Sequence, residues 1–451
     1  MANKIYTGNA ANVPQITTST MSGTFLAGEK VWCEINKKRL TATLASSVAL
    51  SDVANTLRLM IMAANKTDDL HDDEVRTYGG REFGEYHDVQ ATSSGAVLTL
   101  TSTKMRDGTY WPHTVTFGTN SAAGTVGAAV ITQNSTGSSY LDNADNYQGG
   151  TAVAQDDDLY LPEGNFSIQH NINNSLTGIS LYKRNDHHGS IGLPEVNKTW
   201  GTGLHYDEYR PTRLTLPSQA LSAQIIEIGD RWNQNEVRGT VRLDMGAGTA
   251  GTYLVFNLNK TEPYTQQKGA AVDIVGGTGT VSLGCYDASV RIGGKVGDNN
   301  TEINGVTIDG KTAHVTIADT VTGASSQTTQ VYGGMLIDNS KCTGRTYKVY
   351  DGGGLVLTKE GGSVTLLELF GGNTTVSQST SYAIASMVGH GGAKLKVEFG
   401  RFTTATAYAG FEFDDSDNLG TWDDGIEYHG CSIEDVKKKT PKGKKWTMSN
   451  I

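Results

Sequence analysis

Short apolar runs separated by glycine-rich or asparagine-rich corners dominate the chain from about residue 179 to residue 402. Ile225-Ile226-Glu227-Ile228 is followed by Gly229-Asp230, and Leu355-Val356-Leu357 lies between two glycine-containing turns. Many of the runs are only three apolar or β-branched residues long, and no fixed repeat length emerges. Such runs predict β-strands, and their corner residues tolerate the positive φ that tight turns require.

The absence of helical patterns between these strands limits how they can be connected. Parallel strands need crossovers, and a solenoid that coils each turn onto the last solves this with short corners. We therefore predict a mainly β protein with a long right-handed parallel β-helix. A β-sandwich or β-prism is the alternative, but its strands should alternate more cleanly and be joined by recognisable hairpins.

The first third of the chain follows a different pattern. Residues 30–35 and 39–44 alternate around a turn and predict a hairpin. Ser51 is a good N-cap for a helix whose apolar face covers that hairpin. The apolar positions of this face are Val53, Leu57, Met60, Ile61 and Ala64. With further strands expected near 86–90, 96–101 and 113–117, these elements predict a small α+β module.

The patterns divide the chain into five predicted parts. In order they are an extended N-terminal arm, the α+β module, a linker, the β-helix-like domain and a basic C-terminal tail. Their bounds are 1–23, 24–134, 135–166, 167–430 and 431–451. We expect the arm to be ordered only where something else holds it, and the tail to be a solvated end.

Composition agrees with a slender β structure. Glycine (55 residues) far outnumbers proline (8), and 37% of the residues are hydrophobic. The net charge of −10 gives no reason to expect a nucleic-acid partner. Six lysines between residues 437 and 445 are the exception, and an anchor on an acidic protein surface is the alternative to a solvated end.

Cysteine usage and hydropathy indicate a protein that folds in a cytoplasm. Cys33, Cys285, Cys342 and Cys431 are isolated, which is typical of reduced thiols and not of a disulfide framework. The N-terminus has no apolar run that resembles a signal peptide, and no stretch of 18 apolar residues predicts a membrane span.

Three polar clusters are candidate metal sites. They are Asp186-His187-His188 with His205 and Asp207 nearby in sequence, the calcium-loop-like segment 415–420, and Asp156-Asp157-Asp158. Adjacent imidazoles tend to point to opposite sides of a strand, and Leu419 stands where a calcium loop needs an oxygen ligand. We interpret the clusters as polar loops and turns, and we predict no metal and no cofactor.

The enzymatic alternative comes from the architecture, since trimeric β-helix spikes can cleave bacterial surface polysaccharide with paired carboxylates about 5–10 Å apart in a groove. Glu227, Asp244, Asp273 and Asp287 are available, but an irregular repeat does not reveal which of them align. The aromatic residues that could line a sugar groove are interpreted as core or subunit-interface residues. They are Trp200, Tyr206, Tyr209, Trp232, Tyr253 and Tyr264. No nucleotide-binding or nucleophile motif is present, so we predict no catalytic residues.

Several short motifs resemble uncharacterised proteins of tailed phages and of planctomycete-type bacteria, which look like virion structural proteins. The motifs are Ile191-Gly192-Leu193-Pro194, Tyr206-Asp207-Glu208-Tyr209-Arg210, Thr212-Arg213-Leu214, the helix start at Asp52-Val53-Ala54-Asn55-Thr56, and Cys431-Ser432-Ile433-Glu434-Asp435-Val436. The resemblance implies a structural component of a phage particle, assembled as a trimer, and it transfers no functional residues.

The expected function is therefore that of a non-enzymatic, homotrimeric virion protein, such as a capsid decoration protein, head fibre or spike. Its partners would be its own copies and proteins of the capsid or tail, after assembly in the bacterial host cytoplasm. The alternative is a tail spike or tail fibre that binds, or also cleaves, host surface polysaccharide. Recognition would then use the loops that interrupt the strand rhythm, near 182–209 and 414–424.

Overall fold

A computed structural model gives the fold. It describes residues 2–36, 38–64, 76–78, 81–83, 86, 89–104, 108–110, 112–168, 179–184, 186–191, 199–200, 204–205, 214–215, 224–229, 241–244, 250–258, 271–276, 280–294, 302–323, 328–358, 362–415 and 417–449. The motif at residues 206–210, the aromatic residues Trp232 and Tyr264, and the side chains of Trp200, His205 and Asp244 lie outside the described parts.

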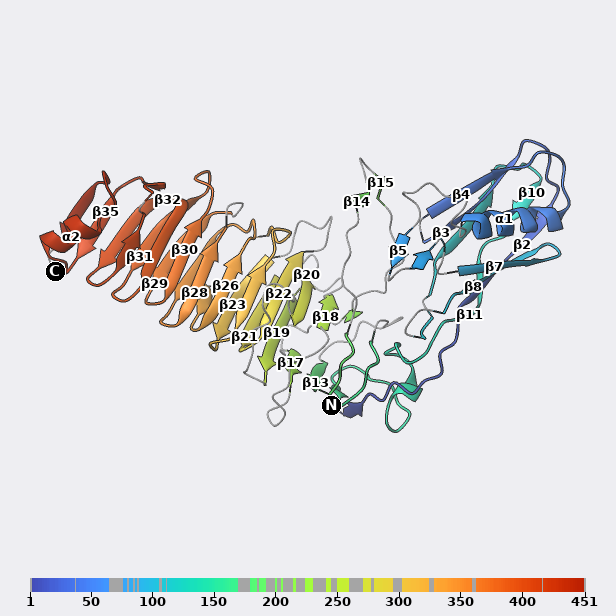
Figure 1. The fold of residues 1–451 in the computed structure, drawn as a ribbon, viewed down its shortest axis with the longest axis horizontal. Helices are drawn as coiled ribbons and strands as arrows, with labels where there is room; N and C mark the ends of the chain where they lie inside the picture. The colour runs from blue at the N-terminus through green and yellow to red at the C-terminus, as the bar shows by residue number, and fades with distance from the viewer. Residues whose placement is uncertain are drawn as a thin grey trace. The chain divides into compact units, whose positions relative to one another are not determined.

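The larger unit is a parallel β-solenoid of about nine turns, which confirms the predicted architecture and excludes the sandwich (Figure 1). Each turn, called a rung below, contributes one strand to each of two sheets, which we call the first and the second face. The first face contains β1 (Asn3–Ile5), β12 (Asp158–Leu161), β13 (Ser180–Lys183), β17 (Gln224–Ile228), β19 (Ala250–Asn257), β21 (Thr280–Tyr286), β23 (Glu302–Asp309), β25 (Thr328–Val331), β27 (Arg345–Val349), β29 (Val364–Leu369), β31 (Ala383–Gly389), β34 (Gly420–Trp422), β35 (Ile426–His429) and β36 (Trp446–Ser449).

The second face contains β16 (Leu214–Thr215), β18 (Val241–Asp244), β20 (Val272–Gly276), β22 (Ser289–Gly294), β24 (His314–Ile317), β26 (Gly334–Asp338), β28 (Gly353–Leu357), β30 (Asn373–Ser377) and β33 (Glu412–Asp414). The 15-residue strand β32 (Lys394–Tyr408) passes through both faces. Strands of one face pair in parallel from rung to rung, so every central strand has its backbone groups bonded on both sides.

The rungs differ in length. On the first face Thr307 pairs with Gln330, Gln330 with Lys348, and Lys348 with Glu368, which are offsets of 23, 18 and 20 residues. Corners of different size absorb the difference. At one of them Gly310 has φ 104°, and a Cβ there would lie 2.2 Å from the Asp287 carboxylate. Variable corners explain why the sequence shows strands without a fixed repeat.

The solenoid core is a narrow column of aliphatic side chains from both faces. Val255, Ile308 and Val349 line the first face from the inside, and Ile292 and Leu357 line the second, each at most 1% exposed. Alternate residues on each strand point outward because successive side chains in a strand point to opposite sides. Tyr253 also lies in this core, as the sequence interpretation allowed.

Both ends of the chain are part of the solenoid, which corrects the predicted arm and tail. Near the N-terminus, β1 pairs in parallel with β12, and the Asp157 carboxylate accepts a hydrogen bond of 2.8 Å from the Ala2 amide. Near the C-terminus, β36 adds a strand beside β35. Each terminal strand is thus bonded on one side to the solenoid, and β1 and β36 are the end strands of its strand order.

The smaller unit is the α+β module, and the chain enters it from the solenoid and returns. Contacts divide the chain into residues 1–7, 147–192 and 212–451 on one side, and 8–146 and 193–211 on the other. Strand β2 (Ile16–Gly23), placed in the arm by the sequence analysis, instead pairs with β8 in the sheet of this module. The predicted boundary at residue 23 therefore separates β2, whose alternate side chains are buried, from the sheet to which this strand belongs.

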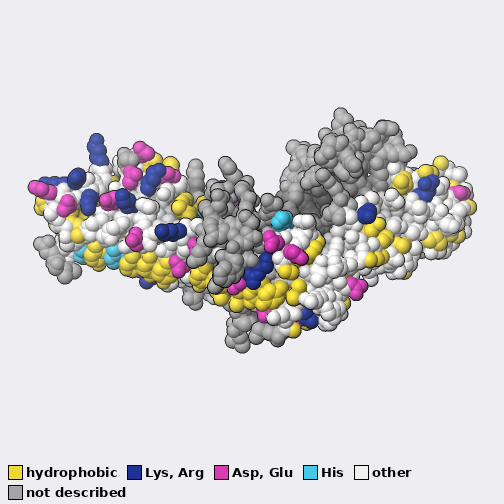
Figure 2. Space-filling view, turned by 60° about the horizontal axis from the view of Figure 1, so that its bottom comes forward, with side chains coloured by type: hydrophobic (Ala, Val, Ile, Leu, Met, Phe, Trp, Pro, Cys, Tyr) yellow, Lys and Arg dark blue, Asp and Glu magenta, His cyan; other side chains and the backbone are white. Residues whose placement is uncertain are grey.

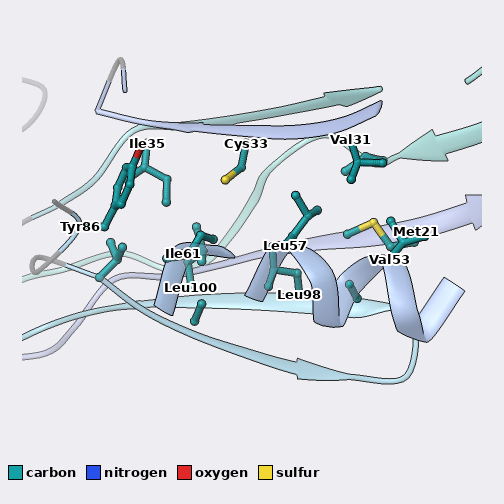
Figure 3. Close-up of a cluster of buried hydrophobic side chains, with 14 of the residues drawn as sticks. Met21, Val31, Cys33, Ile35, Val53, Leu57, Ile61, Tyr86, Leu98 and Leu100 are labelled. Atoms are coloured by element: carbon teal, nitrogen blue, oxygen red, sulfur yellow. The ribbon is translucent and has the colours of Figure 1, made fainter. Parts of the chain in front are cut away.

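The module buries one amphipathic helix against two sheets (Figure 3). Helix α1 (Leu50–Ala64) covers its core with Val53, Leu57 and Ile61, all fully buried. It starts one residue before the predicted N-cap, Ser51. The sheets contain β2, β7 (Val89–Ser94), β8 (Val97–Ser102), β10 (Gly124–Val126) and β11 (Val130–Gln133), and β3 (Lys30–Ile35), β4 (Lys38–Thr43) and β9 (Val115–Thr119). The predicted hairpin is confirmed, with Lys30 opposite Thr43.

The remaining described elements are short. They are the hairpins β5 (Arg76–Tyr78) with β6 (Arg81–Phe83) and β14 (Thr199–Trp200) with β15 (Leu204–His205), a 3₁₀ turn at Ala144–Asn146, and helix α2 (Ile433–Lys439). Within the described residues, neither α-helix is long and apolar enough to cross a membrane.

Candidate functional site

A continuous stack of rings runs along the outside of the first face. Six residues from six successive rungs form it, and we call them the aromatic ladder: Tyr332, Tyr350, Phe370, His390, Tyr408 and His429. Neighbouring ring centroids lie 4.5, 5.1, 4.6, 5.0 and 5.2 Å apart, and the first four pairs are within 13° of parallel. This spacing is close to the separation of neighbouring strands in a sheet.

Strand register places the rings in one column. Val331, Val349 and Leu369 are paired from rung to rung, and the ladder residue follows each of them directly. The same column continues towards the N-terminus with Phe256 and Tyr286, stacked at 4.7 Å. Asp309, which pairs with Tyr286, interrupts the column before the ladder begins. The ladder residues are separated by unequal numbers of residues in the sequence. The strand register therefore aligns them, and no sequence repeat does.

The ladder presents ring edges to solvent, because the ring faces are covered by their neighbours. Tyr332 and Tyr408 are still 41% and 40% exposed. Figure 2 shows a band of hydrophobic side chains, with histidines towards one end, along one side of the solenoid. A sugar normally lies on an open aromatic face, so this surface suits a flat protein partner better than a saccharide.

Ion pairs flank the ladder on the neighbouring outward column. Glu368 Oε2 lies 3.2 Å from Lys348 Nζ, and its Oε1 lies 3.6 Å from His390 Nε2. Glu427 Oε1 lies 3.2 Å from His429 Nε2 in the same way. Charged groups thus line one side of the rings, while the ladder itself contains no carboxylate, lysine or arginine.

A second feature is a shallow depression of about 360 Å³ at the second face. Strand β32 and the loop after β33 supply most of its lining: Ser377, Lys396, Val397, Glu398, Phe399, Asp414, Asp417 and Leu419. Phe399 and Leu419 are 43% and 41% exposed. The depression thus combines apolar surface with groups that donate and accept hydrogen bonds. It coincides with the interrupted stretch 414–424, where the sequence analysis placed a recognition loop.

A β-bulge gives the depression its side chains. Val376 pairs with Val397 and the next residue, Ser377, pairs with Phe399, so Glu398 is an extra residue in β32. The extra residue shifts the alternation, and both Glu398 and Phe399 escape the core. Lys396 Nζ lies 2.7 Å from Glu398 Oε1, and this hydrogen bond lowers the pKa of Glu398.

The calcium-like loop forms the rim of the depression and is held by its own aspartate. Asp415 is 6% exposed, and its carboxylate accepts hydrogen bonds from the Gly420 amide (3.1 Å) and Trp422 Nε1 (3.2 Å). Asn418 adopts φ 56° in the same loop. The Asp415 carboxylate therefore fixes the loop from inside, and among the described residues no group of three potential ligands is arranged to hold a metal ion.

The predicted surface loop at Asp186-His187-His188 is only partly at the surface. His188 is exposed, but His187 is fully buried, and Lys183 Nζ donates a 2.6 Å hydrogen bond to the His187 carbonyl. Burial lowers the pKa of His187 to about 4 and that of Lys183 to about 8. The interpretation as a polar surface loop was wrong for His187, because the strand before it carries the loop into the core.

Three of the four carboxylates considered for catalysis have described side chains, and these three have separate environments; the side chain of Asp244 lies outside the described residues. Asp273 lies 3.0 Å from Arg291 and 3.9 Å from Arg242, which neutralise it. Asp287 holds a corner and accepts a hydrogen bond from Thr312 Oγ1. Glu227 lies in the outer column between Tyr182 and Phe256. Asp157, of the acidic triplet, accepts backbone hydrogen bonds from Ala2 and Ala154 with its two oxygens.

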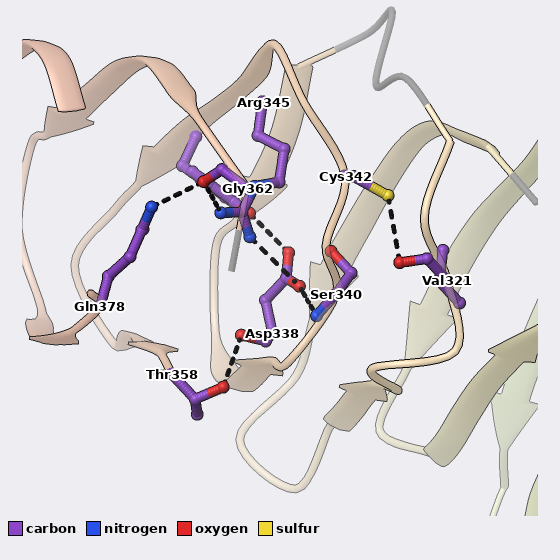
Figure 4. Close-up of polar contacts among 9 residues, drawn as sticks. Val321, Asp338, Ser340, Cys342, Arg345, Thr358, Gly362 and Gln378 are labelled. Carbon is purple, nitrogen blue, oxygen red and sulfur yellow. Dashed lines mark hydrogen bonds and ion pairs between the residues drawn. The ribbon is translucent and has the colours of Figure 1, made fainter. Parts of the chain in front are cut away.

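The sequence analysis missed a polar cluster inside the solenoid (Figure 4). Asp338 pairs with Ile317 and Leu357 in an inward column that is otherwise aliphatic, yet it is 2% exposed. Arg345 Nη1 lies 3.4 Å from its carboxylate, Tyr347 Oη donates to it, and the Ser340 amide donates at 2.8 Å. The sequence shows only that one acidic residue, Asp338, stands at the end of an apolar strand. Such a residue can point into the core or towards solvent, so the sequence does not reveal its burial.

The cysteines agree with the reduced state expected from their spacing. All four are free thiols; Cys33, Cys285 and Cys342 are buried, and Cys431 is half-buried. The fold and these features define the class of the protein as a β-solenoid with an inserted α+β module. Comparison with known proteins adds no family: no family model, no curated protein and no solved structure matches the chain.

Proposed function

We propose that the protein is a non-enzymatic structural component of a bacteriophage particle, and that it assembles as a homotrimer through the aromatic ladder. The observation that carries the proposal is the ladder itself. It is a long column of rings without carboxylate, lysine or arginine on the outside of a sheet, and surfaces of this kind mark protein contacts. A capsid decoration protein, head fibre or spike requires such a stiff, self-associating shaft.

The area of the ladder sets how much of the contact it can supply. Six rungs span roughly 24 Å, and a first-face strand of five residues is roughly 17 Å long, which gives about 400 Å² per copy. Three such surfaces remove about 1,200 Å² from water in total, or about 400 Å² for each of the three pairwise contacts, so neighbouring surface must contribute to a stable interface. Rings of adjacent copies would be able to stack on one another, because the rings of every copy are spaced at the strand separation.

The net charge of the protein also favours the ladder as the surface on which copies meet. Each copy carries a net charge of −10, so identical copies repel one another over most of their surface. The ladder offers a column free of carboxylates on which two like-charged copies can approach. Asp309 marks one end of this column, because a buried carboxylate without a partner would oppose association.

Attachment to the particle is assigned to the basic C-terminal segment. Lys437, Lys438 and Lys439 form the last turn of α2, and Lys442, Lys444 and Lys445 follow it. Lysines at the C-terminal end of a helix are favoured by its dipole and remain available to an acidic surface of a capsid or tail protein.

Light scattering on the purified chain tests the trimer. At micromolar concentration the wild-type protein should have three times the chain mass of 48.1 kDa. Phe370→Glu places a carboxylate in the middle of the ladder and should yield monomers with an unchanged circular dichroism spectrum. Tyr382→Glu is the control, because it introduces the same carboxylate at an exposed aromatic residue (44%) outside the ladder, whereas Phe370 is half-buried. A monomeric wild type, or a trimeric Phe370→Glu variant, would contradict the proposal.

Cryo-electron microscopy of the intact particle tests the virion role separately. Density for the solenoid should appear on the head or tail, and its copy number should be a multiple of three. Particles purified without any copy of the chain would reject the virion role while leaving the trimer test unaffected.

A further inference from the structure

The α+β module has an exposed sheet edge, the strand β11 (Figure 1). Within the described residues, the only strand that pairs with β11 is β2. We propose that β11 binds β11 of a second copy of this chain, edge to edge and antiparallel, so that the two sheets become continuous. The contact shares no residue with the aromatic ladder and does not rest on the proposed virion role.

Both faces of β11 present apolar side chains to solvent. Register places Val130 beside Thr18 and Ile131 beside Thr17, so Val130 and Ile131 project from opposite faces of the sheet. Val130 is 57% exposed and Ile131 is 53% exposed. A strand with one buried face normally carries polar residues on its other face. Exposed apolar side chains on both faces therefore distinguish β11 from an ordinary solvated edge.

Other edge strands of the module carry the usual protection against strand addition. Strand β7, at the opposite end of the same sheet, alternates buried apolar residues with the exposed polar residues Gln90 and Thr92. Strand β4, at one end of the second sheet, begins with Lys38 and Arg39. Polar and charged side chains blunt an edge in this way, because its unpaired backbone groups otherwise recruit another strand. β11 has no charged residue and is instead open to such pairing.

Charge favours a second copy as the occupant of this edge. Residues 118–140 contain no charged side chain and no proline, and the neighbouring strand β2 contains none either. Two chains that each carry a net charge of −10 repel one another over most of their surface. Along this edge they can approach with no like charges on either strand.

The side chains of β11 are also complementary to themselves. Val130, Ile131 and Thr132 are all β-branched, and β-branched side chains pack well opposite one another across an antiparallel pair. Antiparallel pairing of two identical strands has a two-fold axis, so a single contact uses the same surface of both copies and closes.

The contact should be weak. A bulge between Ile131 and Gln133 interrupts the regular register of β11 with β2, so only a short length of edge is available for pairing. A single added strand pair buries less than about 1,200 Å² in total, which is the range of transient associations. We expect a dissociation constant on the order of 100 µM, so the contact forms where copies are crowded together.

Analytical ultracentrifugation of the full chain over a concentration series tests the inference. The Phe370→Glu variant is the starting protein, because it should lack the ladder contact and keep the edge contact. Its mass should double between about 10 µM and about 500 µM, the range that brackets the expected dissociation constant. Adding Ile131→Lys places like charges on the two paired edges and should weaken this association at least about tenfold.

Leu59→Lys is the matched control for the added charge. Leu59 has nearly the same exposure as Ile131 (51%) and lies on helix α1 of the same module, away from the edge. This substitution should leave the association unchanged. Each variant should retain the wild-type circular dichroism spectrum, so that a loss of association is not a loss of fold.

Cross-linking identifies the strand that pairs. The chain carries Cys431→Ser, which removes the half-buried native thiol, and either Ile131→Cys or Leu59→Cys. A short bismaleimide should join two copies through the thiol at position 131 and not through the thiol at position 59.

Three outcomes would overturn the inference. They are a mass that does not change up to about 500 µM, an association that Ile131→Lys does not weaken, and equal cross-linking at positions 131 and 59. None of them bears on the trimer, which is measured on the wild type at micromolar concentration. Conversely, a wild type that is monomeric at micromolar concentration and doubles its mass through Ile131 would reject the proposed trimer and leave this inference intact.

Discussion

Asp338 is the residue that departs most from its surroundings. It occupies an inward position between Ile317 and Leu357, where an unpaired carboxylate would cost several kcal/mol. Arg345, 3% exposed, and Tyr347, 1% exposed, neutralise and hydrogen-bond it. The Arg345 guanidinium also donates to the Gly362 carbonyl, to which Gln378 donates as well. The cluster thereby connects successive rungs at one height of the core.

Removing one partner of this pair should destabilise the solenoid strongly. Asp338→Ala leaves a buried guanidinium without its carboxylate, and we expect the free energy of unfolding to fall by about 3–5 kcal/mol. Replacing both partners, Asp338→Leu with Arg345→Met, should cost less than the single substitution. Urea denaturation followed by circular dichroism measures both.

An exposed ion pair serves as the control for that experiment. Lys394 and Glu412 lie 3.0 Å apart on the same solenoid but are 62% and 56% exposed. Glu412→Ala should change stability by less than about 1 kcal/mol. If Asp338→Ala costs no more than Glu412→Ala, the buried cluster does not stabilise the core.

At the residue scale, the sequence predicted only those features that local chemistry or spacing specifies. The unpaired cysteines followed from their spacing, and the buried helix positions Val53, Leu57 and Ile61 followed from helical periodicity, but the burial of three of the cysteines was not predicted. The inward orientation of Asp338 and the burial of His187 did not, because the orientation of a strand residue depends on the register of its neighbours.

At the scale of elements, the C-terminal segment closes the solenoid. Ser432 caps α2 by accepting a hydrogen bond from the Asp435 amide, and Val436 is fully buried. Thr440 Oγ1 donates to Tyr428 Oη at 3.0 Å, which connects the end of α2 to β35. Terminal caps with a polar outer surface keep repeat proteins soluble, and the lysines of α2 provide that surface.

Removing the cap should expose a sheet edge. Deletion of residues 431–451 removes α2 and β36, so β35 loses its neighbour on one side. We expect a lower melting temperature and end-to-end association, seen as species larger than a trimer in size-exclusion chromatography.

A point variant distinguishes the loss of the cap from a general effect of truncation. Ser432→Ala should reduce stability by about 1 kcal/mol, the usual cost of a lost N-cap. Lys437→Ala, on the exposed side of the same helix, should have little effect. A deletion variant with the melting temperature and size of the wild type would show that the segment is not a cap.

Elements with strong local periodicity were predicted well, and those defined by contacts were not. Helix α1 begins two residues before its predicted start and the hairpin β3–β4 agrees to within one residue, since apolar spacing and a turn residue specify them. Helix α2 was missed because its seven residues have one buried apolar side chain and three lysines, which locally resemble a solvated tail.

The whole molecule consists of two units, each with a buried neutral histidine. His113 lies in the α+β module and accepts or donates a hydrogen bond of 3.2 Å with Ser102 Oγ, and His187 lies in the solenoid. Burial lowers the pKa of each imidazole from 6.5 to about 4. In both units the folded state therefore disfavours the protonated ring.

Stability should consequently fall in acid. Between pH 6.5 and 4 the unfolded chain binds protons at these histidines and the folded chain does not, so stability is highest above pH 6.5 and decreases as the pH falls. The loss is at most about 3 kcal/mol per histidine, from roughly 2.5 units of pKa difference. Thermal unfolding at pH 7.5, 5.5 and 4.5 measures it.

Substitutions assign the effect to each unit. His113→Gln should reduce the acid sensitivity of the module, and His187→Gln that of the solenoid. His188→Gln, at an exposed neighbouring position, should leave both unchanged. A melting temperature that is constant from pH 7.5 to 4.5 in the wild type would contradict the burial of neutral histidines.

The sequence by itself determined the local choices: strands with permissive corners, one amphipathic helix, reduced cysteines and the parallel solenoid that short connections favour. These follow from side-chain chemistry and periodicity over a few residues. Only the tertiary structure decided that both ends of the chain form solenoid strands and that Asp338 faces inward. It also decided that rings 18 to 21 residues apart form one ladder, and that a bulge turns Phe399 outward. The physical reason is register, because rungs of unequal length bring residues together at distances that no local pattern encodes.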